Sequence, residues 1–473
     1  MKALRFLLIL GISFYSCAVN PVTGKKELML ISEQGEIELG QSTDQQIKDQ
    51  FGIYDDAKLN SYVAGIGENL VPHTHRPHLE YHFAVLDTPV VNAFAVPGGY
   101  IYVTRGILAL FSSEAELAVV LGHELGHVNA RHSVQKLSQA MLVQIGFTVG
   151  GALSETFQKI SGLAGIGIQL LFLKYSRDDE READWLGIEY ARKGSYNPEK
   201  MVDFFQSLQK MGDLSEGQSL PGFLSTHPLT SERIKNAQNM ILPEDNNLKV
   251  LQNTYLARLD GMVFGNDPRQ GYVEENAFYH PLMLFTFSFP SKWKLQNQPS
   301  QVILSSEDGK AAVVLQAEES SESLHNYARN ITSKLENTSL LQENHLTING
   351  LQSYQQLLEL RQEEAENLRL RISFIRKSPH IFTLTALSSQ SDFSSYDFRF
   401  GTIIGSFMEL TDKKYINRSP EKLRLIKAKG RDSLKSIFQS KKVDEKHWPQ
   451  LAAMNGLELN QVPKKDQLIK IVN

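Results

Sequence analysis

The 473-residue sequence contains only one cysteine, Cys17. A single thiol excludes an intrachain disulfide framework, a multi-cysteine zinc finger and an iron–sulfur cluster, so any metal ion must be held by histidine and carboxylate side chains. The chain also lacks a basic excess, because 49 Lys and Arg residues accompany 53 Asp and Glu residues and the formal net charge is −4. Nucleic-acid-binding domains usually carry a basic excess, so we expect no nucleic-acid partner.

Long apolar runs are also missing. No segment offers the roughly 18 uninterrupted apolar residues of a transmembrane helix. The apolar run 6–15 is shorter, follows two positive charges and ends just before Cys17, which is typical of a secretory signal. It resembles a bacterial lipoprotein signal over residues 1–17. That resemblance implies lipid attachment at Cys17 and, in a Gram-negative cell, a periplasmic protein anchored to the outer membrane.

The length and the 41% hydrophobic content predict several packed domains rather than a disordered chain. Residues 20–245 alternate helical and strand patterns, and residues 246–270 carry the turn signals of a linker. Residues 271–410 contain alternating strand patterns typical of an antiparallel sheet with one wet face. Residues 421–473 form a third, small unit. We therefore predict an α+β multidomain fold.

One predicted helix carries most of the chemistry. Ser113 and Glu116 form a capping box, so a helix is expected to begin there and continue through residue 132. His123 and His127 lie four residues apart and share one helical face, so both can reach one cation. Glu124 lies roughly 100° further around the helix, where it can accept a proton from a water whose pKa the metal lowers. This spacing indicates a zinc hydrolase.

A third ligand is expected in the acidic stretch 176–184. Glu180 and Asp184 lie four residues apart on one face of a predicted second helix, and spacing alone does not separate them as ligands. The small side chain of Ala183 would let the two helices approach closely. Glu182 is predicted to face solvent.

These motifs together resemble a known family. His123-Glu-Leu-Gly-His127, preceded by the segments 92–95 and 97–99 and followed by the segment 180–184, resembles the HtpX and CAAX-prenyl-endopeptidase family of zinc metallopeptidases, in its soluble bacterial lipoprotein branch. The resemblance implies a mainly helical, zincin-type domain with a small sheet and one zinc ion per chain. It also implies a set of roles: His123, His127 and Glu180 as zinc ligands, Glu124 as general base and Asp184 as the partner that orients a ligand histidine.

Two further site predictions accompany the resemblance. Asn92, Ala93 and Phe94 resemble the family's edge strand, which pairs with an extended substrate. Pro228 forces His227 out of helical geometry and onto a loop, and the family places this segment over the metal. We hypothesise that His227 either donates to the oxyanion of the reaction or caps zinc as a fourth ligand in a latent state.

The two C-terminal units show no catalytic constellation. Residues 271–410, with Trp293, faintly resemble the PsbP-like α/β fold. Residues 421–473 are similar to a LysM module, a βααβ glycan binder, which implies either peptidoglycan binding or a purely structural cap.

Two functional hypotheses follow from the sequence. The first is a zinc endopeptidase of the periplasm, anchored to the outer membrane by its lipid, that cleaves misfolded or stalled envelope proteins. Its partners would be unfolded polypeptide, the membrane and, through the C-terminal module, peptidoglycan. The alternative is a chaperone or outer-membrane assembly adaptor in which His227 keeps the zinc site latent.

Overall fold

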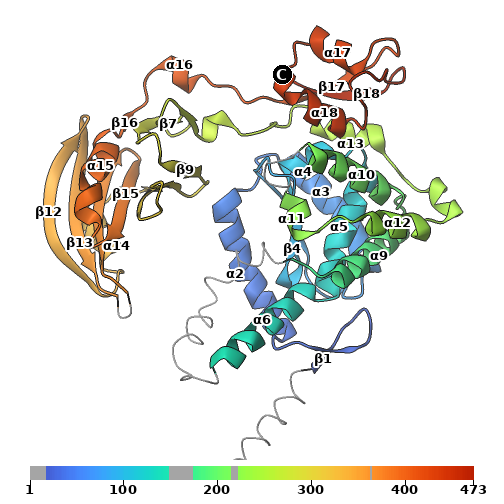
Figure 1. Cartoon of the computed structure of the whole chain (residues 1–473), viewed down its shortest axis with the longest axis horizontal. Coiled ribbons are helices and arrows are strands. Elements are labelled where there is room, and N and C mark those ends of the chain that lie inside the picture. Colours follow the sequence, from blue (N-terminus) through green and yellow to red (C-terminus); the bar gives the residue numbers. More distant parts are fainter. Residues whose placement is uncertain (1–16, 149–173, 215–221, 363–364) are drawn as a thin grey trace, which may run out of the picture. The chain divides into compact units, whose positions relative to one another are not determined.

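The computed structural model describes residues 17–148, 174–214, 222–362 and 365–473 (Figure 1). Residues 1–16 of the predicted signal segment 1–17 lie outside these residues, as does the side chain of Cys17. Two compact units are present: Met1–Asn266 with Glu421–Asn473, and Asp267–Pro420. Within the described ranges, no helix is long and apolar enough to cross a bilayer. The predicted α+β multidomain class is confirmed.

The first unit is mainly helical. Its centre is α5, all of whose residues are buried and whose N-cap is Ser113, as the capping box predicted. A Ser32 side chain similarly caps α2. The helices of this region are α2 (Glu33–Phe51), α3 (Ala57–Leu70), α4 (Arg105–Leu110), α5 (Glu114–Asn129), α6 (His132–Thr148), α9 (Arg177–Lys193), α10 (Lys200–Asp213), α11 (Gly222–Thr226) and α12 (Ser231–Met240).

A three-stranded sheet in the order β3-β5-β4 packs beside α5. Its strands are β3 (His82–Leu86), β4 (Ala93–Val96) and β5 (Tyr100–Thr104). β4 and β5 form an antiparallel hairpin, and β3 runs parallel to β5, so β4 is an edge strand. The turn between them uses Gly98 and Gly99 at φ of 79° and 94°, a left-handed backbone that favours glycine.

Small residues let α5 and α9 pack closely. A Cβ atom on Gly122 would lie 2.9 Å from the carbonyl oxygen of Gly187, and one on Gly126 would lie 3.1 Å from Cα of Ala183. A larger side chain at any of these positions would separate the helices. The predicted close approach at Ala183 is therefore present, and it holds the two motif-bearing helices against each other.

Residues 246–270 and 421–473 differ from the predicted linker and free-standing module. Helix α13 (Gln252–Leu259) buries Tyr255, whose hydroxyl donates to the Leu108 carbonyl at 2.7 Å. The C-terminal residues form β17 (Leu423–Lys427), α17 (Leu434–Ser440), α18 (Trp448–Met454) and β18 (Leu468–Val472), a βααβ order. Their apolar side chains join the core of the first unit. They are thus an integral part of that unit.

The buried ammonium of Lys470 ties this C-terminal segment to α4. Lys470 is 2% exposed, and its Nζ donates to the carbonyls of Ala109, Leu110 and Phe111 at 2.6–3.1 Å. The Met454 carbonyl lies 3.0 Å from the same Nζ, so four carbonyls share its three N–H groups. A cation is favourable where helices end and their last carbonyls lack partners.

The second unit is built on a seven-stranded antiparallel sheet in the order β12-β13-β14-β15-β11-β10-β9, with a four-stranded sheet in the order β16-β8-β7-β6. Successive side chains of a strand point to opposite faces of its sheet. Those on one face of the large sheet pack with α15 in one core, and those on the other face pack with α14 in a second core. The elements are β6 (Tyr272–Glu274), β7 (Ala277–His280), β8 (Phe285–Ser288), β9 (Lys294–Asn297), β10 (Val302–Ser305), β11 (Ala311–Glu319), α14 (Leu324–Thr332), β12 (Thr338–Ile348), β13 (Leu351–Leu360), β14 (Leu368–Lys377), β15 (His380–Ser389), α15 (Phe393–Gly405) and β16 (Met408–Glu409).

Candidate metal centre

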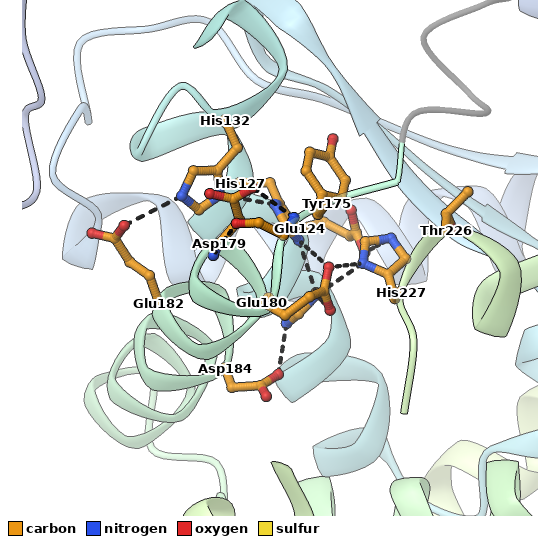
Figure 2. Close-up of polar contacts among 12 residues, drawn as sticks. Glu124, His127, His132, Tyr175, Asp179, Glu180, Glu182, Asp184, Thr226 and His227 are labelled. Atoms are coloured by element: carbon orange, nitrogen blue, oxygen red, sulfur yellow. Dashed lines mark hydrogen bonds and ion pairs between the residues drawn. The ribbon is translucent and has the colours of Figure 1, made fainter. Parts of the chain in front are cut away.

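Four buried side chains from three segments of the chain meet at one point. His123 and His127 come from α5, Glu180 from α9 and His227 from the loop after α11, and one ligand atom of each lies within 4.8 Å of the others. The Nε2 atoms of His123 and His127 are 3.1 Å apart. Nδ1 of His227 lies 2.9 Å from a carboxylate oxygen of Glu180 (Figure 2).

The donor set and its spacing fit zinc. Two nitrogens that are each about 2.0–2.1 Å from one tetrahedral zinc lie roughly 3.3 Å apart, close to the separation of the two Nε2 atoms. Asp184 lies 3.0 Å from Nδ1 of His123 and accepts a hydrogen bond from its N–H, which leaves the lone pair of the neutral imidazole on Nε2. Burial, together with the neighbouring His123, lowers the pKa of His127 well below its usual range. His127 is therefore neutral and able to ligate.

Glu124 stands beside this group with an unused oxygen. Its Oε1 makes no hydrogen bond to any described residue, and Nε2 of His227 is 3.7 Å away. The backbone N–H of Ala95 in β4 donates to the Glu124 carboxylate. Burial raises the pKa of Glu124 to about 7, although the neighbouring His123 acts to lower it. A carboxyl group with such a pKa is suited to exchanging protons near neutral pH.

Arg233 on α12 completes the site, and the sequence offered no sign of its role. Its guanidinium donates to both oxygens of Asp184 at 2.7 and 2.6 Å, and its Nη1 lies 2.6 Å from Oε2 of Glu180. Burial favours the protonated form of Asp184, but Arg233 outweighs it and lowers the pKa of Asp184 to about 2. Asp184 is therefore ionised and remains an acceptor for His123.

His132 and Tyr175 are two further neighbours that sequence reasoning missed. The Nδ1 atoms of His127 and His132 are 2.9 Å apart, and the ring of Tyr175 stacks on His127 with centroids 3.9 Å apart. Arg131 has a φ of 58°, so the chain turns sharply after α5 and brings His132 back toward His127. The expectation that Glu182 faces solvent is wrong, because its side chain is only 22% exposed and lies 3.3 Å from Nε2 of His132 (Figure 2).

The predicted edge strand and His227 lie next to each other. The backbone N–H of Phe223 in α11 donates to the Val91 carbonyl at 2.9 Å, just before β4. The Phe223 ring stacks on His227, with centroids 4.6 Å apart, and His227 is 1% exposed. Ala93 and Phe94 are buried in β4, while Asn92 precedes the strand and its Oδ1 has no hydrogen-bond partner among the described residues.

Sequence comparison identifies the surrounding domain. Residues 57–241 match the sequence model of peptidase family M48. Residues 57–241 are therefore similar to the M48 peptidases. The matched range contains all four clustered residues, and M48 peptidases use zinc, so the donor set agrees with the family's cofactor.

Two curated relatives are similar to this chain over less than half of its length. The "Beta-barrel assembly-enhancing protease" of Yersinia pestis is 29% identical over 229 residues, which cover 46% of this chain and 46% of the relative. The "Mitochondrial metalloendopeptidase OMA1" of Schizosaccharomyces pombe is 29% identical over 233 residues, which cover 47% of this chain and 66% of the relative. The chain spans about half the length of the first curated relatives it matches. These comparisons support a likeness to family M48 over residues 57–241, and the relatives named are not specifically HtpX.

A comparison with solved structures gives a different kind of match. The solution structure of cyanobacterial PsbP (CyanoP) from Synechocystis is similar over 28% of this chain and 91% of its own, at 12% identity and a TM-score of 0.24. A TM-score this low does not establish a shared fold.

Proposed function

We propose that this protein is a zinc-dependent endopeptidase that cleaves unfolded or extended polypeptides. The observation that carries the proposal is the buried group of His123, His127 and Glu180, with the unused Glu124 oxygen beside it and Asp184 behind His123. A buried carboxylate oxygen without a hydrogen-bond partner, such as Oε1 of Glu124, costs stability. A purely structural role for this group of side chains would not explain that cost.

The chemistry divides between the metal and the chain. When bound, zinc lowers the pKa of water and polarises a carbonyl group. Glu124 accepts the proton of the attacking water and returns it to the leaving amine. Asp184 and His132 orient the two histidines from behind. The edge of β4, which includes Ala93 and Phe94, pairs with the extended substrate backbone, and Asn92 offers its unpaired side-chain oxygen to an N–H group of the substrate.

His227 is assigned the role of a latent cap. Its Nδ1 lies 3.3 Å from Nε2 of His123 and 2.9 Å from Glu180, a position that suits a fourth ligand in place of water. Active enzyme would then require the segment that carries Phe223 and His227 to move. Once displaced, the same imidazole could serve as a donor to the oxyanion of the reaction.

We place the enzyme in the cell envelope. The apolar run before Cys17 supports export and lipid attachment, which in a Gram-negative cell means the periplasmic side of the outer membrane. A relative named as a β-barrel assembly-enhancing protease supports misfolded or stalled envelope proteins as substrates. The C-terminal βααβ module is assigned a structural role, supported by Lys470, although its LysM likeness keeps peptidoglycan binding as a second role to test.

A chaperone or assembly adaptor is the alternative function. The observation that favours it is the near-complete burial of His227 over the metal ligands, which would exclude substrate from a permanently latent site. One comparison separates the two functions: purified protein and its Glu124→Gln variant on unfolded casein, with and without a zinc chelator. The peptidase proposal expects cleavage by the unmodified protein alone, abolished by the chelator. Equal cleavage by both proteins would refute the assigned base. Suppression of casein aggregation without cleavage by either would favour the adaptor.

A further inference from the structure

The second unit ends its large sheet in an unusually open edge. β12 spans Thr338–Ile348 and lies at the end of the strand order, paired only with β13 among the described strands (Figure 1). Its residues from Leu340 to Thr347 are all exposed. Strands are usually about 5–6 residues long, and proteins generally protect edges with proline, lysine, short length or a covering segment. β12 contains neither proline nor lysine.

The face of β12 toward α14 borders a groove. Helix α14 packs on β13 and β14 and leaves a cavity of about 410 Å³ beside β12. Thr338, Leu340 and Glu343 line it from β12, and Arg329 lines it from α14. Leu340 is 50% exposed although it lies opposite the buried Leu358 of β13. The apolar face of the sheet therefore extends from Leu358 to Leu340, and α14 leaves Leu340 half exposed.

A buried polar atom in this groove lacks a partner. Gln356 of β13 lies opposite Glu343, is 3% exposed and lines the cavity, yet its Oε1 accepts no hydrogen bond from any described residue. A buried acceptor of this kind usually signals a missing donor. The Tyr354 hydroxyl donates to Glu343 and lowers the pKa of that carboxyl, so Glu343 is ionised at neutral pH. The groove therefore offers a carboxylate, a guanidinium and an amide oxygen above a leucine.

We propose that the β12 edge binds an extended segment of another polypeptide as an added strand. Only a β-strand supplies a matching row of backbone donors and acceptors to an open edge. Alternate side chains of that strand would lie over the groove, near Leu340 and Gln356. The choice of an unfolded polypeptide as partner rests on the proposed peptidase function, which requires such a substrate. β12 would bind the backbone of the substrate, so its binding would show little selectivity for the substrate's sequence.

A second copy of this chain is a less suitable partner. Symmetric antiparallel pairing of two β12 strands centred on the element would place the two Glu343 carboxylates opposite each other. Like charges directly opposite in a sheet are destabilising. An unrelated strand does not bring this repulsion.

The test uses the full chain with Glu124→Gln, so that no probe is cleaved. The probe is a fluorescein-labelled peptide of alternating valine and threonine, and its counterpart is methylated at alternate backbone nitrogens. Binding is measured by fluorescence anisotropy. The edge variant is Leu340→Lys with Leu346→Lys, two exposed positions of β12. The matched control is Leu282→Lys, which changes a 65% exposed leucine of the same unit outside the sheet edge.

We expect the edge variant to weaken peptide binding by about tenfold or more, since lysine on an edge disfavours pairing, and the control to leave it unchanged. Backbone methylation should weaken binding to the same degree, and bound peptide should slow amide hydrogen exchange within residues 338–348. Equal binding by the methylated peptide, or by the edge variant, would overturn the proposal. A dimer in sedimentation that the edge variant dissolves, without peptide binding, would assign the edge to a second copy.

Failure of this inference is distinguishable from failure of the proposed function. If casein is cleaved in a zinc-dependent way but the edge variant binds the peptide as tightly as the parent protein, the strand-addition inference fails and the peptidase function stands. Edge-dependent binding without any cleavage would leave β12 as a binding edge and remove the peptidase function.

Discussion

The two units each end a sheet in an edge strand, and the two edges differ in length, exposure and surroundings. β4 has four residues, all buried, and the N–H of Ala95 within it donates to Glu124. β12 has 11 residues and is exposed over most of its length. The segment around Phe223 lies against the start of β4, whereas no described segment covers β12.

This difference separates catalysis from capture. Catalytic electrostatics needs burial, because a low dielectric strengthens the interactions of charges and shifts pKa values. The buried group of Arg233, Asp184 and Glu180 meets that condition. Strand addition needs exposure instead of burial, because the added strand must reach a row of free backbone N–H and C=O groups. Among the described residues, no second group of metal-ligating side chains gathers as the one beside β4 does.

Asp184→Asn should produce a large effect at the covered edge. The amide can still contact His123 but no longer holds its tautomer by charge, so we expect zinc affinity to fall by about 10–100-fold. Competition with a chromogenic chelator measures this affinity directly. Asp178→Asn, which alters a carboxylate with an 82% exposed side chain on the same helix, should leave it unchanged. Unaltered zinc affinity in Asp184→Asn would remove Asp184 from its assigned role.

His227→Ala should open the covered edge. Loss of the capping imidazole frees a ligand position for water, so we expect casein cleavage to rise by roughly tenfold, which corresponds to about 1.4 kcal/mol in the barrier. Initial rates of fluorescent casein release measure the change. His82→Ala, a change at a half-exposed imidazole of β3, is the control. A fall in rate with zinc affinity retained would show that His227 acts as an oxyanion donor instead.

The edge variant of β12 should have the smallest effect on catalysis. Leu340→Lys with Leu346→Lys leaves the metal centre intact, so cleavage of a short fluorogenic peptide should be unchanged. Cleavage of unfolded casein should show KM raised by about threefold to tenfold with kcat unchanged, the pattern of lost uniform binding. A fall in kcat for the short peptide would contradict the separation of capture from catalysis.

The sequence predicted the parts of the site that depend on local spacing. The cap at Ser113 and the shared face of His123 and His127 are local patterns, and the structure has both. Spacing could not rank Glu180 against Asp184, because their difference arises from the roll of α9 against α5. In the structure, Glu180 points at the cluster while Asp184 contacts the far nitrogen of His123.

Contacts between distant segments were beyond sequence reasoning. Arg233 acquires its role only when α12 packs on α9, and His132 only through the left-handed turn at Arg131. Lys470 is buried against α4, a contact between distant segments that no local pattern indicates. The same limit explains why residues 421–473 were expected to be a separate module, since their alternation does not reveal which core they join.

The most direct test of the metal centre is the zinc content of the purified full chain by mass spectrometry, for the unmodified protein and for Glu180→Gln. We predict one zinc per chain in the unmodified protein, and a large loss of zinc after dialysis in Glu180→Gln with folding retained by circular dichroism. Glu38→Gln, an exposed change on α2, should keep its zinc. A full zinc complement in Glu180→Gln, or none in the unmodified protein under zinc-replete conditions, would contradict the assignment of His123, His127 and Glu180 as the metal ligands.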